Sequence, residues 1–262
     1  MKNYTCVGYD KKLEFDKPEP KFNQEKKISI ILPTYNEEKN IKNLVMALRQ
    51  SLRKTKYKEK FEIVVVDDNS KDRTPRIIDN LAEIGDFIAV HRNNHKGLFS
   101  AIQDGISISN GDFVLLMDSD FSHSPETIQE MVKHIDKYDL VSGSRFVEGG
   151  KMEAPFLRVL GSKVINGVCG KIMGMEIKDI AGGFHLIKKE KFNKLKFKYP
   201  SHFGEFDFEL LYRAQKSGMK IKEIPFTYKF RQEGESKMGN LTGASFNAAK
   251  YFKRALQLRF GK

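Results

Sequence analysis

Five short apolar runs separated by helical patterns are the feature that most constrains how this chain folds. Uninterrupted apolar runs of five or six residues are typical of parallel strands that are buried on both faces. Alternation of such strands with helices predicts an α/β fold, with one Rossmann-like, mostly parallel sheet and helices on both faces. The runs cover residues 28–32, 61–66, 87–91, 112–117 and 140–144.

The segments between these runs carry helix signals. Residues 37–53 place apolar side chains at a spacing of three and four, which is the pattern of an amphipathic helix. Thr74 followed by Pro75, and Ser124 followed by Pro125, mark the starts of two further helices. We also expect a helix over residues 98–109.

The chain divides into three parts on this pattern. Residues 1–26 are polar and charged and predict a loosely ordered N-terminal arm. Residues 27–240 form one domain, whose C-terminal half loses the regular alternation after residue 145. Residues 241–262 predict a basic amphipathic helix, and residues 155–173 predict another long helix.

Composition excludes several classes of protein. The hydrophobic content of 40% is that of a folded globular chain. Two cysteines, Cys6 and Cys169, cannot build a disulfide framework, so we expect a cytoplasmic location. The polar start of the chain is no signal peptide, and no apolar run is long enough to span a bilayer. The net charge of +12 favours an anionic partner of some kind.

Polar clusters directly follow three of the predicted strands, at residues 34–38, 67–72 and 118–123. In open parallel sheets, ligands bind outside the carboxyl ends of the strands. The three clusters are therefore expected to line one crevice. The first of them contains no glycine-rich dinucleotide or P-loop motif, which excludes those two kinds of nucleotide site.

Asp118 and Asp120 are the most informative pair in these clusters. Two carboxylates at a strand end suit Mg²⁺ or Mn²⁺, and such an ion can bridge the oxygens of a diphosphate. Asp67 lies at another strand end, where its carboxylate can accept hydrogen bonds from a base or ribose, and Tyr35 and Glu37 can contact the same base. Of the six histidines only His123 adjoins the acidic pair, and we expect it to support that loop.

Three motifs together resemble the family 2 glycosyltransferases of GT-A fold. Among these, the chain is most similar to the polyprenol-phosphate sugar transferases, in particular the dolichol-phosphate mannosyltransferases. The subgroup likeness is carried by Ser-His-Ser-Pro-Glu at 122–126, Ser-Gly-Ser-Arg-Phe at 142–146, and Gly-Glu-Ser-Lys at 234–237 after Arg231. The family motifs are IILPTYNE at 30–37, VVDDNS at 65–70 and MDSDFSH at 117–123.

The resemblance implies a role for each matching residue. The nucleotide base and ribose would be surrounded by Pro33, Tyr35, Glu37 and Asp67. The metal ion would be held by Asp118, Asp120 and Ser122. The acceptor phosphate and the donor diphosphate would be bound by Arg145, Arg158, Arg231 and Lys237, with Ser162 nearby.

The reaction implied is transfer of mannose from GDP-mannose to a polyprenyl phosphate, with inversion at the sugar. A phosphate acceptor is already an anion at neutral pH, so it needs cations for positioning rather than a strong base. UDP-glucose as donor and a saccharide hydroxyl as acceptor remain open. For a hydroxyl acceptor Asp207 or Glu209 would be the base, and Ala181-Gly182, where a hydroxyl residue is commoner, also leaves the acceptor open.

A lipid acceptor implies peripheral contact with the cytoplasmic face of a membrane. The 241–262 helix gathers apolar residues on one side, although it could equally pack on the domain. The 155–173 helix is the other candidate for that contact, and a small membrane partner subunit is a further possibility. Arg158, inside that helix, could also be a surface side chain.

Two other functions fit the sequence less well. A sugar-nucleotide pyrophosphorylase would carry a glycine-rich basic loop after the first strand, and residues 33–38 contain no glycine. Nucleic-acid binding would need stacking aromatics interleaved with basic residues, and the three acidic clusters would repel phosphates. No nucleic-acid partner is expected.

Overall fold

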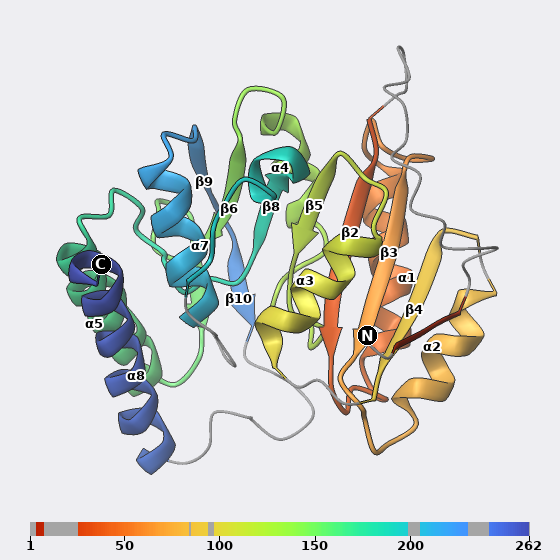
Figure 1. Ribbon diagram of the computed structural model, residues 1–262, viewed down its shortest axis with the longest axis horizontal. Coiled ribbons are helices and arrows are strands. Elements are labelled where there is room, and N and C mark those ends of the chain that lie inside the picture. Colours follow the sequence, from red (N-terminus) through yellow and green to blue (C-terminus); the bar gives the residue numbers. More distant parts are fainter. Residues whose placement is uncertain are drawn as a thin grey trace.

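The computed structural model describes residues 4–7, 26–83, 85–93, 97–198, 205–229 and 241–261, with side chains omitted at 4–7 and 241–247. Its main sheet has eight strands in the order β1-β4-β3-β2-β5-β8-β6-β9 (Figure 1). In chain order these strands are β1 (Tyr4–Val7), β2 (Ile28–Thr34), β3 (Phe61–Asp67), β4 (Phe87–Arg92), β5 (Phe113–Leu116), β6 (Leu140–Ser144), β8 (His185–Lys188) and β9 (Ile221–Pro225).

Six of these strands run in the same direction, so the predicted mostly parallel α/β sheet is confirmed. The parallel pairs are β4 with β3, β3 with β2, β2 with β5, and β6 with β9. Strand β8 runs antiparallel between β5 and β6. The carboxyl ends of β2, β3, β5 and β6 therefore share one edge of the sheet, and β8 begins at that edge.

The N-terminal arm differs from the prediction in one place. Residues Tyr4–Val7 form β1, which pairs antiparallel with β4. Without β1, the backbone N–H and C=O groups along the outer side of β4 would be unpaired at the sheet edge, and the added strand satisfies them. The sequence did not predict this short strand within the loosely ordered arm.

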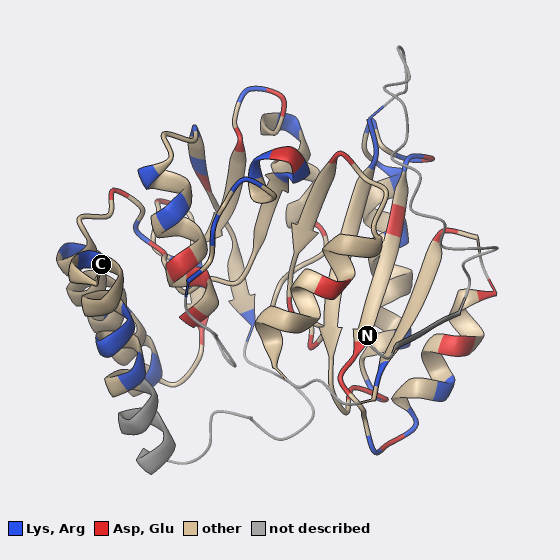
Figure 2. Cartoon of the chain, viewed as in Figure 1, with Lys and Arg blue, Asp and Glu red and all other residues tan. Residues whose placement is uncertain are grey.

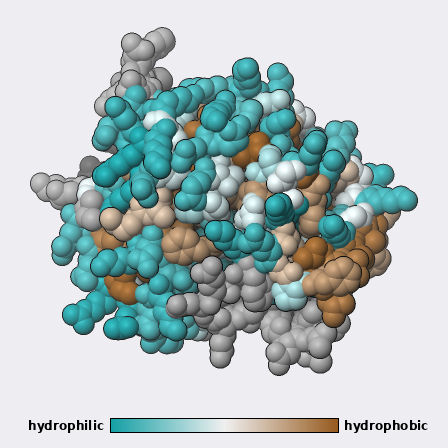
Figure 3. Space-filling model, turned by 180° about the vertical axis from the view of Figure 1, so that it is seen from behind, coloured by the Kyte–Doolittle hydropathy of each residue, from teal (hydrophilic) through white to brown (hydrophobic). Residues whose placement is uncertain are grey.

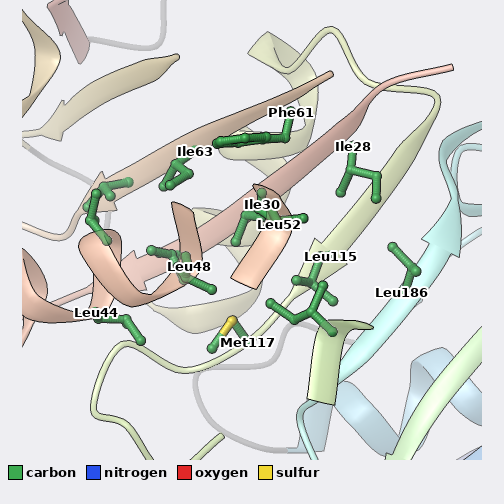
Figure 4. Packing of buried hydrophobic residues seen from close by; sticks show 14 of the residues in the cluster. Ile28, Ile30, Leu44, Leu48, Leu52, Phe61, Ile63, Leu115, Met117 and Leu186 are labelled. Carbon is green, nitrogen blue, oxygen red and sulfur yellow. The ribbon is translucent and has the colours of Figure 1, made fainter. Parts of the chain in front are cut away.

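Helices cover both faces of the sheet, as predicted. One face packs against α1 (Ile41–Arg53), α2 (Thr74–Ala82) and α4 (Thr127–His134), where Leu44 and Leu48 contact the strand residues Ile30 and Leu115 in one buried cluster (Figure 4). The other face packs against α3 (Leu98–Ile108), α5 (Phe156–Met173), α7 (Glu205–Lys216) and α8 (Leu241–Phe260), with the short α6 (Lys189–Phe192) at its rim.

The C-terminal half adds structure outside the main sheet. Strands β7 (Lys151–Glu153) and β10 (Thr227–Lys229) pair in parallel as a separate two-stranded sheet. Helices α5 and α8 lie side by side at one end of the molecule (Figure 1). A buried ion pair at 3.1 Å between Arg254 on α8 and Glu209 on α7 attaches the final helix to the domain. Among the described residues, no helix is both long and apolar enough to cross a membrane.

Candidate active site

Three loops at the carboxyl edge of the sheet form the centre of the site. They follow β2, β3 and β5, and Figure 2 shows acidic residues at the lower ends of these central strands. Each loop contains one non-glycine residue with a positive φ: Asn36 at 54°, Asn69 at 63° and Phe121 at 61°. Asparagine adopts this conformation readily, but for phenylalanine it is strained, and such strain gathers at functional loops.

Hydrogen bonds connect the loop after β2 to the loop after β3. The backbone N–H of Asn36 donates to Ser70 Oγ at 2.8 Å, and the side-chain oxygen of Asn36 accepts from the N–H of Lys71 at 2.8 Å. The N–H of Glu37 donates to Thr74 Oγ1 at 2.8 Å. These bonds hold residues 37–40 out of α1, so the helix begins at Ile41 and not at Glu37 as its apolar spacing had suggested.

The residues predicted to surround the base lie in these two loops. Asp67 is buried, and its carboxylate accepts from the N–H of Ser70 at 3.1 Å and from the hydroxyl of the same residue. Burial raises the pKa of Asp67, although the bonds from Ser70 partly oppose this. Tyr35 is exposed, Glu37 is buried, and Pro33 is half-buried. Their contact with a base stays a prediction.

A buried arginine braces the loop after β3, and sequence reasoning did not find it. Arg92 Nη1 donates to Asp68 Oδ1 at 3.0 Å, and its Nε lies 3.2 Å from Asp104 Oδ2. The other oxygen of Asp68 accepts from the N–H of Gly97 at 2.9 Å. Asp68 is thus committed to the scaffold, which leaves ligand contacts to its neighbours.

The two carboxylates of the acidic loop after β5 differ in exposure. Asp118 is exposed and Asp120 is half-buried, with Asp120 Oδ1 accepting from the N–H of Ser122 at 3.0 Å. Ser119 turns the opposite way and donates to the carbonyl of Pro33 at 3.1 Å. The loop is therefore anchored through its middle residue to the loop after β2.

The donor atoms in this loop fit a hard divalent cation. Ser122 Oγ is buried and has no hydrogen-bond partner in the described part of the chain, so it is available to a ligand. Carboxylate and hydroxyl oxygens are the ligands that Mg²⁺ and Mn²⁺ prefer. No group of three or more His, Cys, Asp or Glu side chains within the described ranges could hold a metal. An ion on Asp118, Asp120 and Ser122 would complete its shell with water and substrate phosphate.

His123 is buried behind the acidic loop. Its Nδ1 accepts from the backbone N–H of Asp118 at 3.1 Å, and its Nε2 lies 2.8 Å from the carbonyl oxygen of Gly182. Burial lowers the pKa of His123 to about 4, which keeps the ring neutral at physiological pH. The ring stacks on Phe184 with centroids 4.9 Å apart.

Arg145 lies at the end of β6 and is bound to a buried carboxylate. Its Nε and Nη2 donate to the two oxygens of Asp179 at 2.8 Å and 2.7 Å, and Nη2 also donates to the carbonyl of Ala181 at 3.0 Å. Burial opposes the charge, but the bonds to Asp179 outweigh it and raise the pKa of Arg145. Binding of a phosphate by Arg145 stays a prediction. Any such contact would use the part of the guanidinium that the ion pair with Asp179 leaves accessible.

Tyr228 on β10 is a second residue that sequence reasoning missed. The guanidinium carbon of Arg145 lies 5.6 Å from its ring centroid. Burial raises the pKa of the phenol, and the charges of Arg158, Asp120, Asp118 and Arg145 also act on it. The ring of Tyr228 also lies 6.4 Å, centroid to centroid, from that of His123, whose Nδ1 accepts from the N–H of Asp118, so Arg145 and the acidic loop meet at this residue. No sequence pattern marked Tyr228 as a site residue, because its short strand follows an irregular part of the chain.

The remaining predicted residues lie on α5 or outside the described chain. Arg158 and Ser162 are half-buried and one helical turn apart on α5. Asn166, one turn further, donates to the carbonyl of Ser162 at 2.8 Å and accepts from the N–H of Ile180 at 2.7 Å, which ties the helix to the loop before β8. Arg231 and Lys237 fall outside the described residues.

The two candidate bases for a hydroxyl acceptor have different surroundings. Glu209 is buried and accepts from the N–H of Lys198 at 2.7 Å, from Arg213 at 2.6 Å and from Arg254 at 3.1 Å, which commits it to packing α7. Asp207 Oδ1 lies 3.3 Å from Nε2 of the buried His185. A side chain on Gly183 would come within 3.4 Å of His123 and 3.7 Å of Asp207, so Asp207 lies close to the acidic loop.

Comparison with known proteins agrees with this geometry. Residues 29–196 match the model of the family described as Glycosyl transferase family 2. The chain is 36% identical over 225 residues to the dolichol-phosphate mannosyltransferase of Pyrococcus furiosus, which covers 82% of this chain and 60% of that protein. It is 32% identical over 232 residues to the polyprenol monophosphomannose synthase of Mycolicibacterium smegmatis, which covers 85% of each chain. The chain thus spans less than two thirds of the Pyrococcus protein.

Solved structures give the same fold. The glucosyl-3-phosphoglycerate synthase of Mycobacterium tuberculosis, in complex with Mn²⁺, uridine diphosphate and phosphoglyceric acid, superposes with a TM-score of 0.68. The match covers 90% of this chain and 79% of that one, at 16% identity. At that identity the likeness concerns the fold alone.

Proposed function

Because the chain belongs to glycosyltransferase family 2, we propose that it transfers mannose from GDP-mannose to a polyprenyl phosphate such as dolichyl phosphate. The observation that carries the proposal is that Arg145 and the acidic loop meet at Tyr228. The guanidinium carbon of Arg145 lies 5.6 Å from the ring centroid of Tyr228, and the ring of His123, whose Nδ1 accepts from the N–H of Asp118, lies 6.4 Å from it. In the proposal, a metal site for the donor diphosphate would lie beside a cationic site for an acceptor phosphate. Similarity to a dolichol-phosphate mannosyltransferase and to a polyprenol monophosphomannose synthase supports the same sugar and lipid class.

The chemistry follows from the groups that face each other. An oxygen of the acceptor phosphate attacks the anomeric carbon of mannose, the bond from that carbon to the GDP oxygen breaks, and GDP departs with the electron pair. One displacement of this kind inverts the anomeric centre. Arg145 and Arg158 position the acceptor phosphate, which needs no general base because it is already an anion.

Mg²⁺ or Mn²⁺, held by Asp118, Asp120 and Ser122, would supply positive charge to stabilise the departing diphosphate. The structural neighbour's complexes with Mn²⁺ and with Mg²⁺ support this choice of ion. The base and ribose would be held between the loops after β2 and β3 by Asp67, Pro33, Tyr35 and Glu37. Arg231 and Lys237, which lie outside the described residues, would add positive charge for the phosphates.

Contact with a membrane surface is part of the proposal, since the acceptor is a lipid. Helices α5 and α8 expose large apolar side chains, and Figure 3 shows them gathered at one end of the molecule. Exposed Lys163, Lys171, Lys253 and Arg259 on the same helices can each contribute ~1 kcal/mol at an anionic surface. The apolar residues are Phe156, Leu157, Leu160, Val164, Val168, Phe252, Leu256 and Phe260.

This surface is continuous with the site through α5. Arg158 follows Phe156 and Leu157 in the first turn of that helix, and its charge reaches Tyr228. A lipid whose chain lies along the apolar side chains would therefore present its phosphate at Arg158. A small membrane partner subunit on the same face would be distinguished by whether the purified chain alone binds vesicles.

The test uses the purified protein with Mn²⁺ or Mg²⁺ and radiolabelled GDP-mannose or UDP-glucose, each with and without dolichyl phosphate. We expect label to move from GDP-mannose into the lipid, with kcat/KM lowered at least about 100-fold by Asp120→Ala, since support of a metal site alone is worth 10–100-fold. Asp136→Ala is the matched control, because Asp136 is exposed and, among the described residues, forms its one ion pair with Lys56 at the surface. Its activity should stay at the wild-type level.

Each other outcome changes a named part of the proposal. Transfer from UDP-glucose alone would keep the reaction and replace the sugar. Absence of lipid product, together with donor hydrolysis that needs Asp120, would point to a saccharide acceptor. Asp207 would then be the base to test, because Glu209 is committed to three hydrogen bonds.

A further inference from the structure

The ring of His123 joins two segments that belong to different halves of the site. On one side it contacts the backbone of Asp118, and on the other it contacts the backbone of Gly182, 59 residues further along the chain. A backbone N–H can only donate and a backbone carbonyl can only accept. The ring therefore carries its proton on Nε2 and accepts through Nδ1, so a single tautomer satisfies both contacts.

The packing around the ring leaves it no other orientation. Phe184 lies parallel to it at an interplanar angle of 8°, and Phe226 meets its edge with centroids 5.5 Å apart. Gly183 has a φ of 67°, and a Cβ there would come within 3.4 Å of the ring. A shift of the Gly182 segment must therefore move the ring, and the ring must move the amide of Asp118.

The Gly182 segment also holds the predicted phosphate-binding arginine. Asp179 and the carbonyl of Ala181 bind the guanidinium of Arg145, directly before Gly182 in the chain. The route from Arg145 through residues 179–182 and His123 to Asp118 consists of hydrogen bonds and one peptide segment. It connects the acceptor side of the site to the metal side.

We propose that His123 is a positioning residue that fixes Asp118 for the metal ion through Nδ1 and couples it to the Arg145 segment through Nε2. This inference rests on the proposed function, because it takes Asp118 as a metal ligand. A ring that only filled space would not need both backbone contacts, and its replacement would change stability without changing metal affinity selectively.

Two substitutions separate the two contacts. His123→Asn keeps an acceptor oxygen near the place of Nδ1 and loses the reach to Gly182. His123→Gln keeps a donor near the place of Nε2 and loses the acceptor for Asp118. The control is His134→Gln, because His134 lies on α4, where its ring contacts the half-buried Glu130 and the edge of Tyr138, away from the acidic loop. Urea unfolding of each variant reports the loss of stability separately.

The measurements are Mn²⁺ affinity in the presence of GDP, followed by the EPR signal of free Mn²⁺, and the KM for dolichyl phosphate. We expect His123→Gln to weaken Mn²⁺ binding about 10–100-fold, the usual effect of removing support from a metal ligand. We expect His123→Asn to keep most of that affinity and to raise the KM for the acceptor instead.

Three results would overturn the proposal in different ways. Equal losses of Mn²⁺ affinity in the Asn and Gln variants, in proportion to their lost stability, would reduce His123 to a packing role. Unchanged Mn²⁺ affinity in Asp120→Ala would remove the metal site from this loop, and the positioning role would fall with it. A loss of Mn²⁺ affinity in Asp120→Ala, with no loss in His123→Gln, would support the metal site and refute only the role of the histidine.

Discussion

The loops after β2, β3 and β5 and the C-terminal half from β6 onward are held together in different ways. In the first region, neighbouring parallel strands bring polar loops side by side, and short side chains such as Asn36, Ser70 and Thr74 lace them. In the second region, single ion pairs between residues far apart in the chain, such as Arg145 with Asp179, hold the segments together. The first region adds many short hydrogen bonds to the buried pair of Arg92 with Asp68, whereas the second depends on its ion pairs.

The sharpest test of this difference is Asp179→Ala. The substitution leaves Arg145 buried without its carboxylate and takes an acceptor from the N–H of the same residue. Breaking a buried pair in this way typically costs about 3–5 kcal/mol. We expect that loss in the free energy of unfolding in urea, together with a higher KM for the acceptor phosphate.

Asp136→Ala serves as the comparison for that loss. Its exposed pair with Lys56 should contribute less than about 1 kcal/mol. A similar loss in both variants would contradict the claim that the C-terminal half depends on its ion pairs.

A smaller effect is expected from Ser70→Ala in the laced loops. The change removes the acceptor of the Asn36 N–H and one donor to the buried Asp67 carboxylate. Leaving such groups unpaired costs about 1–3 kcal/mol. Because the affected loops face the donor, the KM for GDP-mannose should rise while the KM for the lipid stays close to wild type.

Ser107→Ala is the matched control on α3, where the hydroxyl only donates to the carbonyl of Asp104 within the same helix. Its stability should lie within about 0.5 kcal/mol of wild type. A rise in acceptor KM larger than the rise in donor KM for Ser70→Ala would show that the two regions are not separable.

The smallest effect on stability is expected from the double variant Phe156→Ser and Phe260→Ser. The two side chains are 77% and 72% exposed, so their loss should change the free energy of unfolding by less than about 0.5 kcal/mol. Flotation with vesicles of anionic lipid should show weaker binding, and the KM for dolichyl phosphate should rise. Unchanged flotation would remove α5 and α8 from the membrane contact.

The two regions also differ in how far the sequence predicts them. Asp118 and Asp120 could be placed at a strand end because apolar runs mark strands and the fold rule for parallel sheets gives the edge. The alternation likewise predicted the helices on both faces. These signals are local in the chain, so one sequence suffices to read them.

The C-terminal half depends on pairings that no local pattern encodes. Nothing in the sequence around residue 228 shows that Tyr228 packs near Arg145 and His123, or that Asp179 binds Arg145 across 34 residues. The strand β1 was missed for the same reason. A four-residue segment forms a strand only when a sheet edge is available to pair with it, and β4 provides that edge. The start of α1 at Ile41 could not be predicted either, because it depends on hydrogen bonds between the loops after β2 and β3.

The reversed direction of β8 has a consequence for how such enzymes can diverge. Parallel neighbours contribute to the site only through the residues that follow them, but a reversed strand contributes through the residues that precede it. Residues 174–184, between α5 and β8, can therefore be exchanged without disturbing the order in which the donor loops emerge from the sheet. In the proposed function, acceptor preference can change through this segment while the donor loops stay as they are, provided that the carbonyl of Gly182 keeps its contact with His123.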